Sequence, residues 1–424
     1  MNERLLQYIW QHQLFDKSTL LTTRLEKLQI IHPGKWNHNQ GPDFSEAAIR
    51  VGNTRWIGNI ELHVLSSHWL DHKHDQDKAY DNVVLHVVWK EDRDLGNRFP
   101  TLVLQDRVPK SLLVKYDQIS KTHQFIPCAN VFRSVDGLIV RKTMERAYVS
   151  RLQERSQEIA DLLTIAGGSW EEVTWWLLAK HFGQPVNCHA FFELAKTVSW
   201  NCIARHRHNP LQVEALLFGQ AGMIHLKTSD PYLKMLQQEF RFLRRKLHLS
   251  APHFPFHFLR MRPANFPSVR LAQLCALILR EKTLFDKMIA IENKKQAYDF
   301  FETEIGAYWL HHYRPGDQAA YHRKNLGRAF CNLLLINLVV PLKFCRAMFL
   351  KDEWAKARAL EILFELPAED NKITRNFKIL GMDILSAADS QALLELKQKK
   401  CDQLLCLQCG IGHAILKTHQ DSHS

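Results

Sequence analysis

Two short stretches constrain the fold of this chain most: Gly-Pro-Asp-Phe at 41–44 and Gly-Asn-Ile-Glu-Leu-His at 58–63. Between them, an apolar run ends at Gly52-Asn53. Both residue types tolerate the positive φ angles of a tight turn, so the pattern predicts an antiparallel hairpin. Side chains two residues apart on a strand point to the same face. Glu61 and His63 should therefore project together, and the hairpin can bring Asp43 beside them.

There is a chemical reason to gather two carboxylates and an imidazole. Two ionised carboxylates about 4 Å apart repel each other by roughly 4 kcal/mol at an effective dielectric constant near 20. A divalent cation removes this repulsion and uses both acids as hard oxygen ligands. Asp43 and Glu61 are therefore the candidate ligands of Mg²⁺ or Mn²⁺, and His63 is the candidate group that positions a water for attack on a phosphodiester.

These residues resemble the signature of the PD-(D/E)xK nuclease superfamily. Pro42-Asp43 matches its Pro-Asp pair, and 61–63 matches its acid-x-Lys triplet, with His63 where lysine is usual. The expected element order also agrees: an amphipathic helix near 5–14, a strand at 28–31, the hairpin, a helical stretch over 69–80 and a strand at 83–89. The resemblance implies an α+β fold with an N-terminal restriction-endonuclease-like α/β core and a metal-dependent nuclease activity on DNA or RNA.

The histidine at position 63 leaves two alternatives open. Histidine is a weaker fixed positive charge than lysine at pH 7, so the chain could be an inactive nucleic-acid-binding protein on a nuclease-like scaffold. Lys73 or Lys78 could instead supply the missing charge. On the first helix, Glu3 and Gln7 could also face the metal.

Histidines are dense after the hairpin, at positions 68, 72, 74 and 86. His68 and His72 lie four residues apart and would share one face of a helix over 69–80. That spacing suits a zinc pair. A zinc-dependent hydrolase that uses His63, His68, His72 and His86 is therefore a third hypothesis.

Composition favours a cytoplasmic protein with an acidic partner. The formal net charge is +12, which makes nucleic acid the first candidate partner. An odd number of cysteines, nine, without an apolar leader indicates a reducing compartment. The most apolar stretch, 331–342, is too short to span a membrane, so we expect a buried helix ending near Pro341.

The helical period dominates after residue 136, which predicts three regions. They are an α/β domain at 1–127, a large all-α domain at 128–396 and a cysteine-containing segment at 397–424. Pro100 to Leu104 should form one further strand of the first domain, as an edge strand. Helices are expected over 139–163, 170–182, 187–206, 210–222, 229–248, 269–303, 318–350, 352–365 and 390–405.

An arginine-rich stretch begins at Arg260 and continues through Arg262 to Arg270. Two prolines suggest extended backbone, and guanidinium groups suit phosphate oxygens. With Phe266 as a stacking side chain, these arginines are candidate nucleic-acid contacts. The alternative is a loop whose arginines bind helix C-terminal carbonyls.

The C-terminal segment contains Cys401, Cys406, Cys409 and His413. Together they offer a tetrahedral zinc set. Alternatively, the three cysteines could hold an iron–sulfur cluster with Cys128 as the fourth ligand, as some nucleases of the PD-(D/E)xK superfamily do. The remaining possibility is reduced, buried thiols.

Several stretches together resemble one bacterial family, known as domain of unknown function 2851. The resemblance spans nearly the full length but assigns no activity. It is carried by residues 7–12, 41–44, 58–63, 80–88, 214–222 and 262–267 and by the cysteine tail.

Overall fold

The computed structural model describes residues 1–37, 40–96, 98–121, 124–250 and 254–417. It is a mixed α+β protein with two compact units. Unit 1 combines residues 1–143 with 396–424, and unit 2 comprises residues 144–395. The C-terminal segment from 397, which we expected to be separate, thus belongs to the N-terminal unit. Residues 418–424 of this segment lie outside the described part of the chain.

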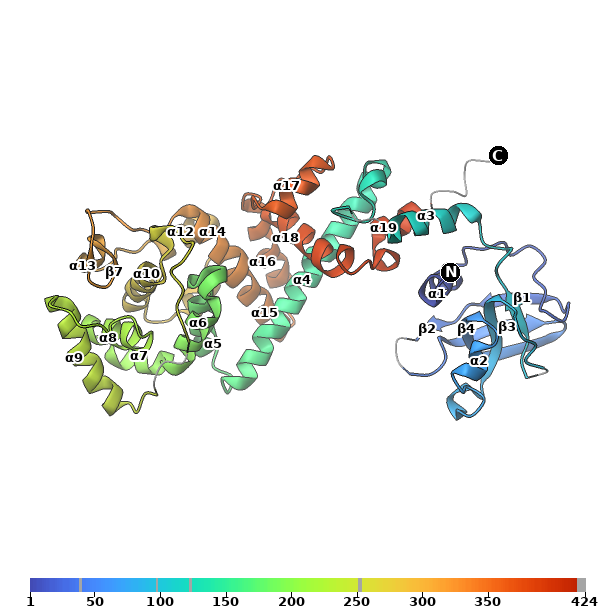
Figure 1. The fold of residues 1–424 in the computed structure, drawn as a ribbon, viewed down its shortest axis with the longest axis horizontal. Helices are drawn as coiled ribbons and strands as arrows, with labels where there is room; N and C mark the ends of the chain where they lie inside the picture. Colours follow the sequence, from blue (N-terminus) through green and yellow to red (C-terminus); the bar gives the residue numbers. More distant parts are fainter. Residues whose placement is uncertain (38–39, 97, 122–123, 251–253, 418–424) are drawn as a thin grey trace. The chain divides into compact units, whose positions relative to one another are not determined.

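Unit 1 is built around one mixed sheet (Figure 1). Its elements are α1 (Glu3–Gln11), β1 (Leu28–His32), β2 (Lys35–Trp36), β3 (Phe44–Val51), β4 (Thr54–Leu65), α2 (His68–Asp71), η1 (Lys78–Tyr80), β5 (Val83–Lys90), β6 (Thr101–Val103), α3 (Lys110–Ser120), η2 (Ala129–Ser134), η5 (Lys397–Cys401), η6 (Cys406–Gln408) and α19 (Gly410–Lys417). The helix α4 (Gly137–Ile165) begins in this unit.

The strand order is β1-β3-β4-β5-β6, and β2 pairs with the first two residues of β3. The predicted hairpin is confirmed, because β3 and β4 are antiparallel and Val51 faces Thr54 across the turn. The strands β4, β5 and β6 are mutually parallel. The β4–β5 connection therefore crosses over the sheet, and it contains α2 and η1.

Apolar burial fixes the register of this sheet. Phe44, Ile60 and Leu62 are fully buried, as are Leu85 and Val87 on β5. A shift by one residue would turn these side chains to the opposite face, so the register is strongly specified. The same register sets Glu61 beside His86 on the neighbouring strand.

The helix α1 covers part of the sheet and packs against β4. Its N-cap is Asn2, whose side chain accepts a hydrogen bond from the Leu5 N–H. The apolar side chains of the helix, among them Leu6 and Trp10, are buried. Its remaining face carries Glu3 and Gln7, both half-buried.

The helical stretch predicted over 69–80 is wrong in extent. The helix α2 is a single turn, and His72 is its C-cap. The chain then turns through Lys73, whose φ of 59° lies in the left-handed region. Helical structure returns only at η1, so the backbone between Lys73 and Lys78 is a turn and not a continuation of α2.

Unit 2 is almost entirely helical. Beyond α4 its elements are α5 (Trp170–Phe182), α6 (Gln184–Thr197), α7 (Trp200–His206), α8 (Pro210–Gln220), α9 (Pro231–Lys246), η3 (Pro263–Asn265), α10 (Pro267–Arg280), α11 (Phe285–Ile289), α12 (Lys294–Phe301), α13 (Ala307–Leu310), β7 (His312–Arg314), β8 (Asp317–Gln318), α14 (Arg328–Leu334), η4 (Leu335–Val339), α15 (Val340–Leu350), α16 (Glu353–Glu365), α17 (Lys372–Ile379) and α18 (Ala387–Leu396).

The helix expected to end near Pro341 does not end there. It runs over Arg328–Leu350, and its turn at Leu335–Val339 is a π-helix. Proline lacks an N–H and its ring clashes with the carbonyl four residues earlier, and a π-turn relieves both constraints. This helix is long and apolar enough to cross a membrane, but its most apolar window is 61% buried within the protein, so core packing explains its composition.

Candidate functional site

The candidate site lies where the start of β3 meets the middle of β4. The N–H of Asp43 donates a 3.0 Å hydrogen bond to Oε2 of Glu61, and Oδ2 of Asp43 accepts one of 3.0 Å from the N–H of Leu62. The two acids predicted from the sequence are therefore neighbours. Each is held by main-chain groups of the other's strand.

The helix α1 adds two side chains to the same place. Nε2 of Gln7 donates a 2.8 Å hydrogen bond to Oδ1 of Asp43. The charge of Glu3 acts on both Asp43 and Glu61 and raises the pKa of each. Gln7 therefore orients the Asp43 carboxylate, and Glu3 adds a further negative charge on the same helix.

Burial is the main cause of the raised pKa values of these acids. It raises the pKa of Asp43 well above the usual range, and hydrogen bonds from Leu62 and Gln7 offset only part of this. Glu61 is 5% exposed, and burial followed by the charge of Asp43 raises its pKa further. A cation placed between two such carboxylates would remove the cost of ionising both.

His63 is fully buried on β4, and its two ring nitrogens meet different groups. Nδ1 is hydrogen-bonded to Nε2 of His86 at 2.9 Å. Nε2 lies 3.6 Å from Oε1 of Glu61, which is too long for a hydrogen bond, and it has no other hydrogen-bond partner. Burial and the neighbouring imidazoles lower the pKa of His63 to about 2, so at neutral pH this residue does not provide lysine's positive charge.

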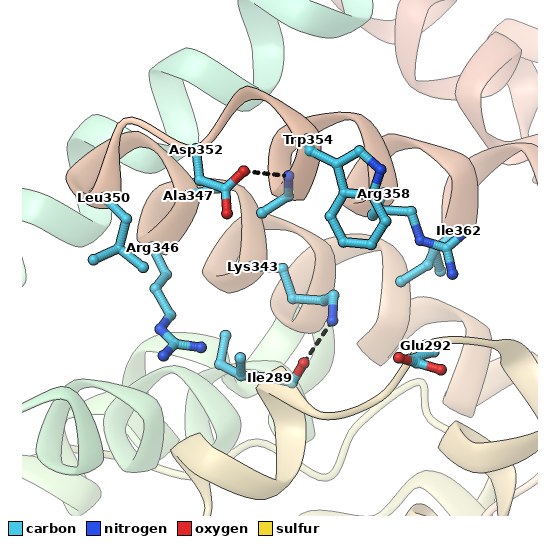
Figure 2. Close-up of a pocket in the computed structure, with 11 residues that line it drawn as sticks. Ile289, Glu292, Lys343, Arg346, Ala347, Leu350, Asp352, Trp354, Arg358 and Ile362 are labelled. Carbon is cyan, nitrogen blue, oxygen red and sulfur yellow. Dashed lines mark hydrogen bonds between the residues drawn. The ribbon is translucent and has the colours of Figure 1, made fainter.

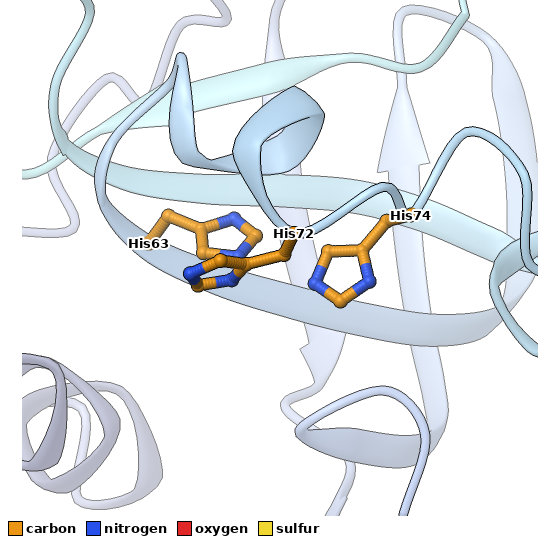
Figure 3. A group of neighbouring side chains, drawn as sticks. All are labelled: His63, His72 and His74. Atoms are coloured by element: carbon orange, nitrogen blue, oxygen red, sulfur yellow. The ribbon is translucent and has the colours of Figure 1, made fainter.

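A group of imidazoles surrounds His63. One ligand nitrogen each from His63, His72 and His74 lies within 4.8 Å of the others (Figure 3). Nε2 of His74 is also 3.5 Å from Oε1 of Glu61, and its ring stacks on Tyr80 with centroids 3.8 Å apart.

The other predicted histidines take different positions around this group. His86 contacts His63 on the side of Nδ1, and the ring of His68 lies 6.1 Å from that of His63. His74 was not among the candidate site residues inferred from the sequence. The pattern His-x-His at 72–74 was the available signal, but the expected helix would have separated these two rings.

Neither candidate lysine is buried in the site. Lys73 and Lys78 are both exposed at the surface of unit 1. Lys73 instead matters through its backbone, because its left-handed conformation lies between His72 and His74.

The candidate arginines in unit 2 differ from one another. Arg260 and Arg262 are exposed, whereas Arg270 is buried on α10 and 7% exposed. Arg270 donates hydrogen bonds to Asn265 and Gln273, at 2.7 and 3.0 Å, and lies 4.0 Å from the centre of the Phe330 ring. The expected extended backbone is also wrong, because 263–265 forms a 3-10 turn and α10 starts at Pro267.

The cysteines converge in unit 1 without His413. The thiols of Cys401, Cys406 and Cys409 interact electrostatically with that of Cys128, and burial raises the pKa of Cys128 to about 12. His413 is directed elsewhere, since its Nδ1 is hydrogen-bonded to the Tyr8 hydroxyl at 2.6 Å.

A separate pocket of about 310 Å³ lies within unit 2, between α11, α15 and α16 (Figure 2). Its lining includes three cations, two acids and the exposed indole of Trp354; the charged residues are Lys343, Arg346, Arg358, Glu292 and Asp352. Lys343 already donates a hydrogen bond to the Ile289 carbonyl, and Arg358 pairs with Glu361. This basic pocket was not foreseen from the sequence, because its residues are scattered over three helices.

Comparison with known proteins identifies a family. No curated protein and no solved structure matches the chain. The model of one family, described as "Protein of unknown function (DUF2851)", matches residues 3–372. The matched region contains Asp43, Glu61, the histidine group and Cys128, and it ends before Cys401. The chain therefore belongs to the DUF2851 family.

Proposed function

We propose that this protein is a metal-dependent nuclease that hydrolyses phosphodiesters of DNA or RNA. The observation that carries the proposal is the pair of half-buried Asp43 and buried Glu61, which are held by reciprocal hydrogen bonds to each other's segments and have raised pKa values. Such a pair is costly to ionise without a cation and well suited to bind one.

The topology of unit 1 supports relating it to the PD-(D/E)xK core. The helix α1 precedes the antiparallel strands β1, β3 and β4, and β5 is parallel to β4 after a short crossover. The Pro-Asp pair stands immediately before β3, and the acid-x-His triplet lies within β4. These are the positions that the resemblance implies for the catalytic residues.

The donor set fits Mg²⁺ or Mn²⁺, because carboxylate oxygens are the ligands that such ions prefer. Asp43 and Glu61 would hold the ion, and Glu3 lies close enough for its charge to act on both. A bound divalent cation neutralises charge and activates a water or a phosphoryl oxygen. Gln7 keeps the Asp43 carboxylate in place. The neutral ring of His63 offers an electron pair at Nε2 that can orient a water.

The exposed arginines of unit 2 and the basic pocket beside Trp354 are the proposed contacts with nucleic acid. Guanidinium groups pair with phosphates, and an exposed indole can stack on a base. Arg270 is excluded from this role, because its guanidinium is buried and already bound to Asn265 and Gln273.

The test is cleavage of labelled single- and double-stranded DNA and RNA with Mg²⁺ or Mn²⁺. Asp43→Asn should lower the rate at least ~100-fold, since even groups outside the metal's direct ligands change affinity or activity 10–100-fold. Glu46→Gln is the matched control, because Glu46 is an exposed acid of β3 paired with Lys35. Metal-dependent cleavage that survives Asp43→Asn would refute the proposal. Binding without cleavage by the wild type would support the inactive scaffold instead.

The convergence of four thiols supports a second metal centre at Cys128, Cys401, Cys406 and Cys409. Among the described residues, three metal-ligand atoms lie within 4.8 Å of one another only in the histidine group. The four thiols form no such group, so they are spaced more widely than the ligands of a single ion. An iron–sulfur cluster, whose cysteines bind different irons, tolerates wider spacing. Metal analysis and absorption spectra after anaerobic purification test this, with Cys128→Ser against Cys188→Ser as control. Protein free of iron and zinc would exclude the centre.

A further inference from the structure

The geometry points to a transition-metal site, filled by Zn²⁺, that is formed by His63, His72 and His74, with Oε1 of Glu61 beside His63 and His74. It stands on its own contacts, whether or not the carboxylate pair beside it cleaves phosphodiesters. None of the comparisons assigns a metal to these histidines.

The first observation is the spacing of the donor atoms. Two ligands at 2.0–2.1 Å from a tetrahedral zinc ion lie about 3.3–3.4 Å apart. Oε1 of Glu61 is 3.6 Å from Nε2 of His63 and 3.5 Å from Nε2 of His74. His72 supplies a third ring nitrogen, and the ligand nitrogens of His63, His72 and His74 all lie within 4.8 Å of one another (Figure 3). Glu61 is outside this group of three and approaches two of its members.

The second observation is an unpaired buried nitrogen that faces this point. Nε2 of His63 is fully buried and has no hydrogen-bond partner. An unsatisfied buried polar atom costs about 1–3 kcal/mol, and a metal ion would remove this cost. When Nε2 binds a metal, the ring proton is on Nδ1, where Nε2 of His86 can accept it at 2.9 Å. A hydrogen bond of this kind is the usual support of a metal-binding histidine.

The third observation is the backbone that carries the other two rings. Lys73 directly follows His72, the C-cap of α2, at a position where a left-handed residue commonly ends a helix. Lys73 has φ of 59° directly between His72 and His74. Stacking of His74 on Tyr80 further fixes that ring. The segment after α2 is thus shaped to present both imidazoles to His63.

The two sites share one residue. Oε2 of Glu61 accepts the hydrogen bond of the Asp43 N–H, whereas Oε1 faces the histidines. A cation at the histidines would supply positive charge beside Glu61, where the PD-(D/E)xK signature has its lysine. With Nε2 of His63 on that cation, the cation would take over the positioning of the water from the free ring. These consequences rest on the proposed function, but the binding site does not.

The experiment is titration of the metal-free full-length protein with Co²⁺, whose visible absorption reports a tetrahedral nitrogen-rich site, followed by displacement with Zn²⁺. We expect the wild type to bind one Co²⁺ at this site. His72→Ala and His74→Ala should weaken binding at least ~100-fold. His72 is exposed, so its removal leaves the fold intact and carries the test if the His74 variant is unstable.

Two controls separate this site from its surroundings. His68→Ala removes a neighbouring imidazole outside the group and should leave Co²⁺ binding unchanged. Asp43→Asn should abolish cleavage while Co²⁺ binding persists, so failure of the nuclease proposal is distinguishable from failure of this one. The inference is overturned if the wild type gives no tetrahedral spectrum, if His72→Ala binds Co²⁺ as the wild type does, or if His68→Ala loses binding equally.

Discussion

Asp43 and Glu61 hold each other in place across two strands: the N–H of Asp43 binds Oε2 of Glu61 at 3.0 Å, and the Asp43 carboxylate binds the next N–H after Glu61, that of Leu62, at 3.0 Å. Main-chain donors normally lower a carboxyl pKa. Here burial outweighs them, and both acids remain hard to ionise. This reciprocal arrangement preorganises two oxygen ligands but brings no positive charge to them.

The first prediction concerns stability against pH. The pKa values of Asp43 and Glu61 are higher in the folded than in the unfolded chain, so their contribution to stability is complete below the unfolded value, ~4, and is lost as pH rises through the folded values. When a chelator keeps the protein free of metal, the melting temperature should fall as pH rises through and beyond neutrality. Saturating Mn²⁺ should flatten this fall.

Thermal unfolding of two variants provides the controls for this measurement. Asp43→Asn should remove much of the pH dependence, because one of the two coupled acids is gone. Glu46→Gln should keep it, since Glu46 is an exposed acid whose pKa is lowered by the hydrogen bond from Lys35. A wild-type melting temperature that rises steadily with pH in chelator would contradict the electrostatic account.

The second prediction concerns Gly58, three residues before Glu61. A Cβ on this buried glycine would lie 2.5 Å from the Asn82 carbonyl oxygen and 2.5 Å from Cγ1 of Val84. Gly58→Ala should therefore push β4 from β5 and cost about 1–3 kcal/mol of unfolding free energy. Gly137→Ala, in α4, meets no atom within 4 Å and should raise stability by about 0.4–1 kcal/mol. Denaturant titration that finds both changes neutral would disprove the close approach.

The third prediction separates two arginines that look alike in the sequence. Arg270→Met leaves Asn265 and Gln273 without their donor and should cost about 2–3 kcal/mol of unfolding free energy. Arg262→Ala is a surface change and should alter stability by less than ~0.5 kcal/mol. If Arg262 contacts a phosphate, its loss should also reduce the salt dependence of nucleic-acid binding by ~1 charge. Equal unfolding free energies for both variants would refute the structural role of Arg270.

The sequence predicted the parts of the site that local patterns determine. The Gly52-Asn53 turn and the alternation along β4 were sufficient to bring Asp43, Glu61 and His63 together. The helix α5 was likewise predicted at its observed bounds, because Ser169 caps it and accepts a hydrogen bond from Glu172. In these cases the residues that determine the structure are close together in the chain.

The remaining parts depend on long-range packing or on backbone choices without a sequence signal. Lysine has no preference for a positive φ angle, so the sequence did not predict the turn at Lys73 or the approach of His74 to His63. Cys128 meets the C-terminal cysteines only because the tail folds onto unit 1, where α19 packs against α3 and Lys115 binds the Ile415 carbonyl. The exposure of an arginine also depends on the tertiary fold. Arg270, for example, is buried among hydrogen-bond acceptors, and its residue type does not predict this.

The central claim, that Asp43 and Glu61 together hold a divalent cation, is tested most directly by calorimetric titration of the metal-free protein with Mg²⁺ near pH 8. Mg²⁺ is the suitable probe, because it prefers oxygen ligands and is a poor match for the histidine group. We predict one Mg²⁺ bound per chain, with affinity reduced at least ~100-fold in Asp43→Asn and in Glu61→Gln and unchanged in Glu46→Gln. Mg²⁺ binding that is as strong in Asp43→Asn as in the wild type, or no binding by the wild type at millimolar Mg²⁺, would contradict it.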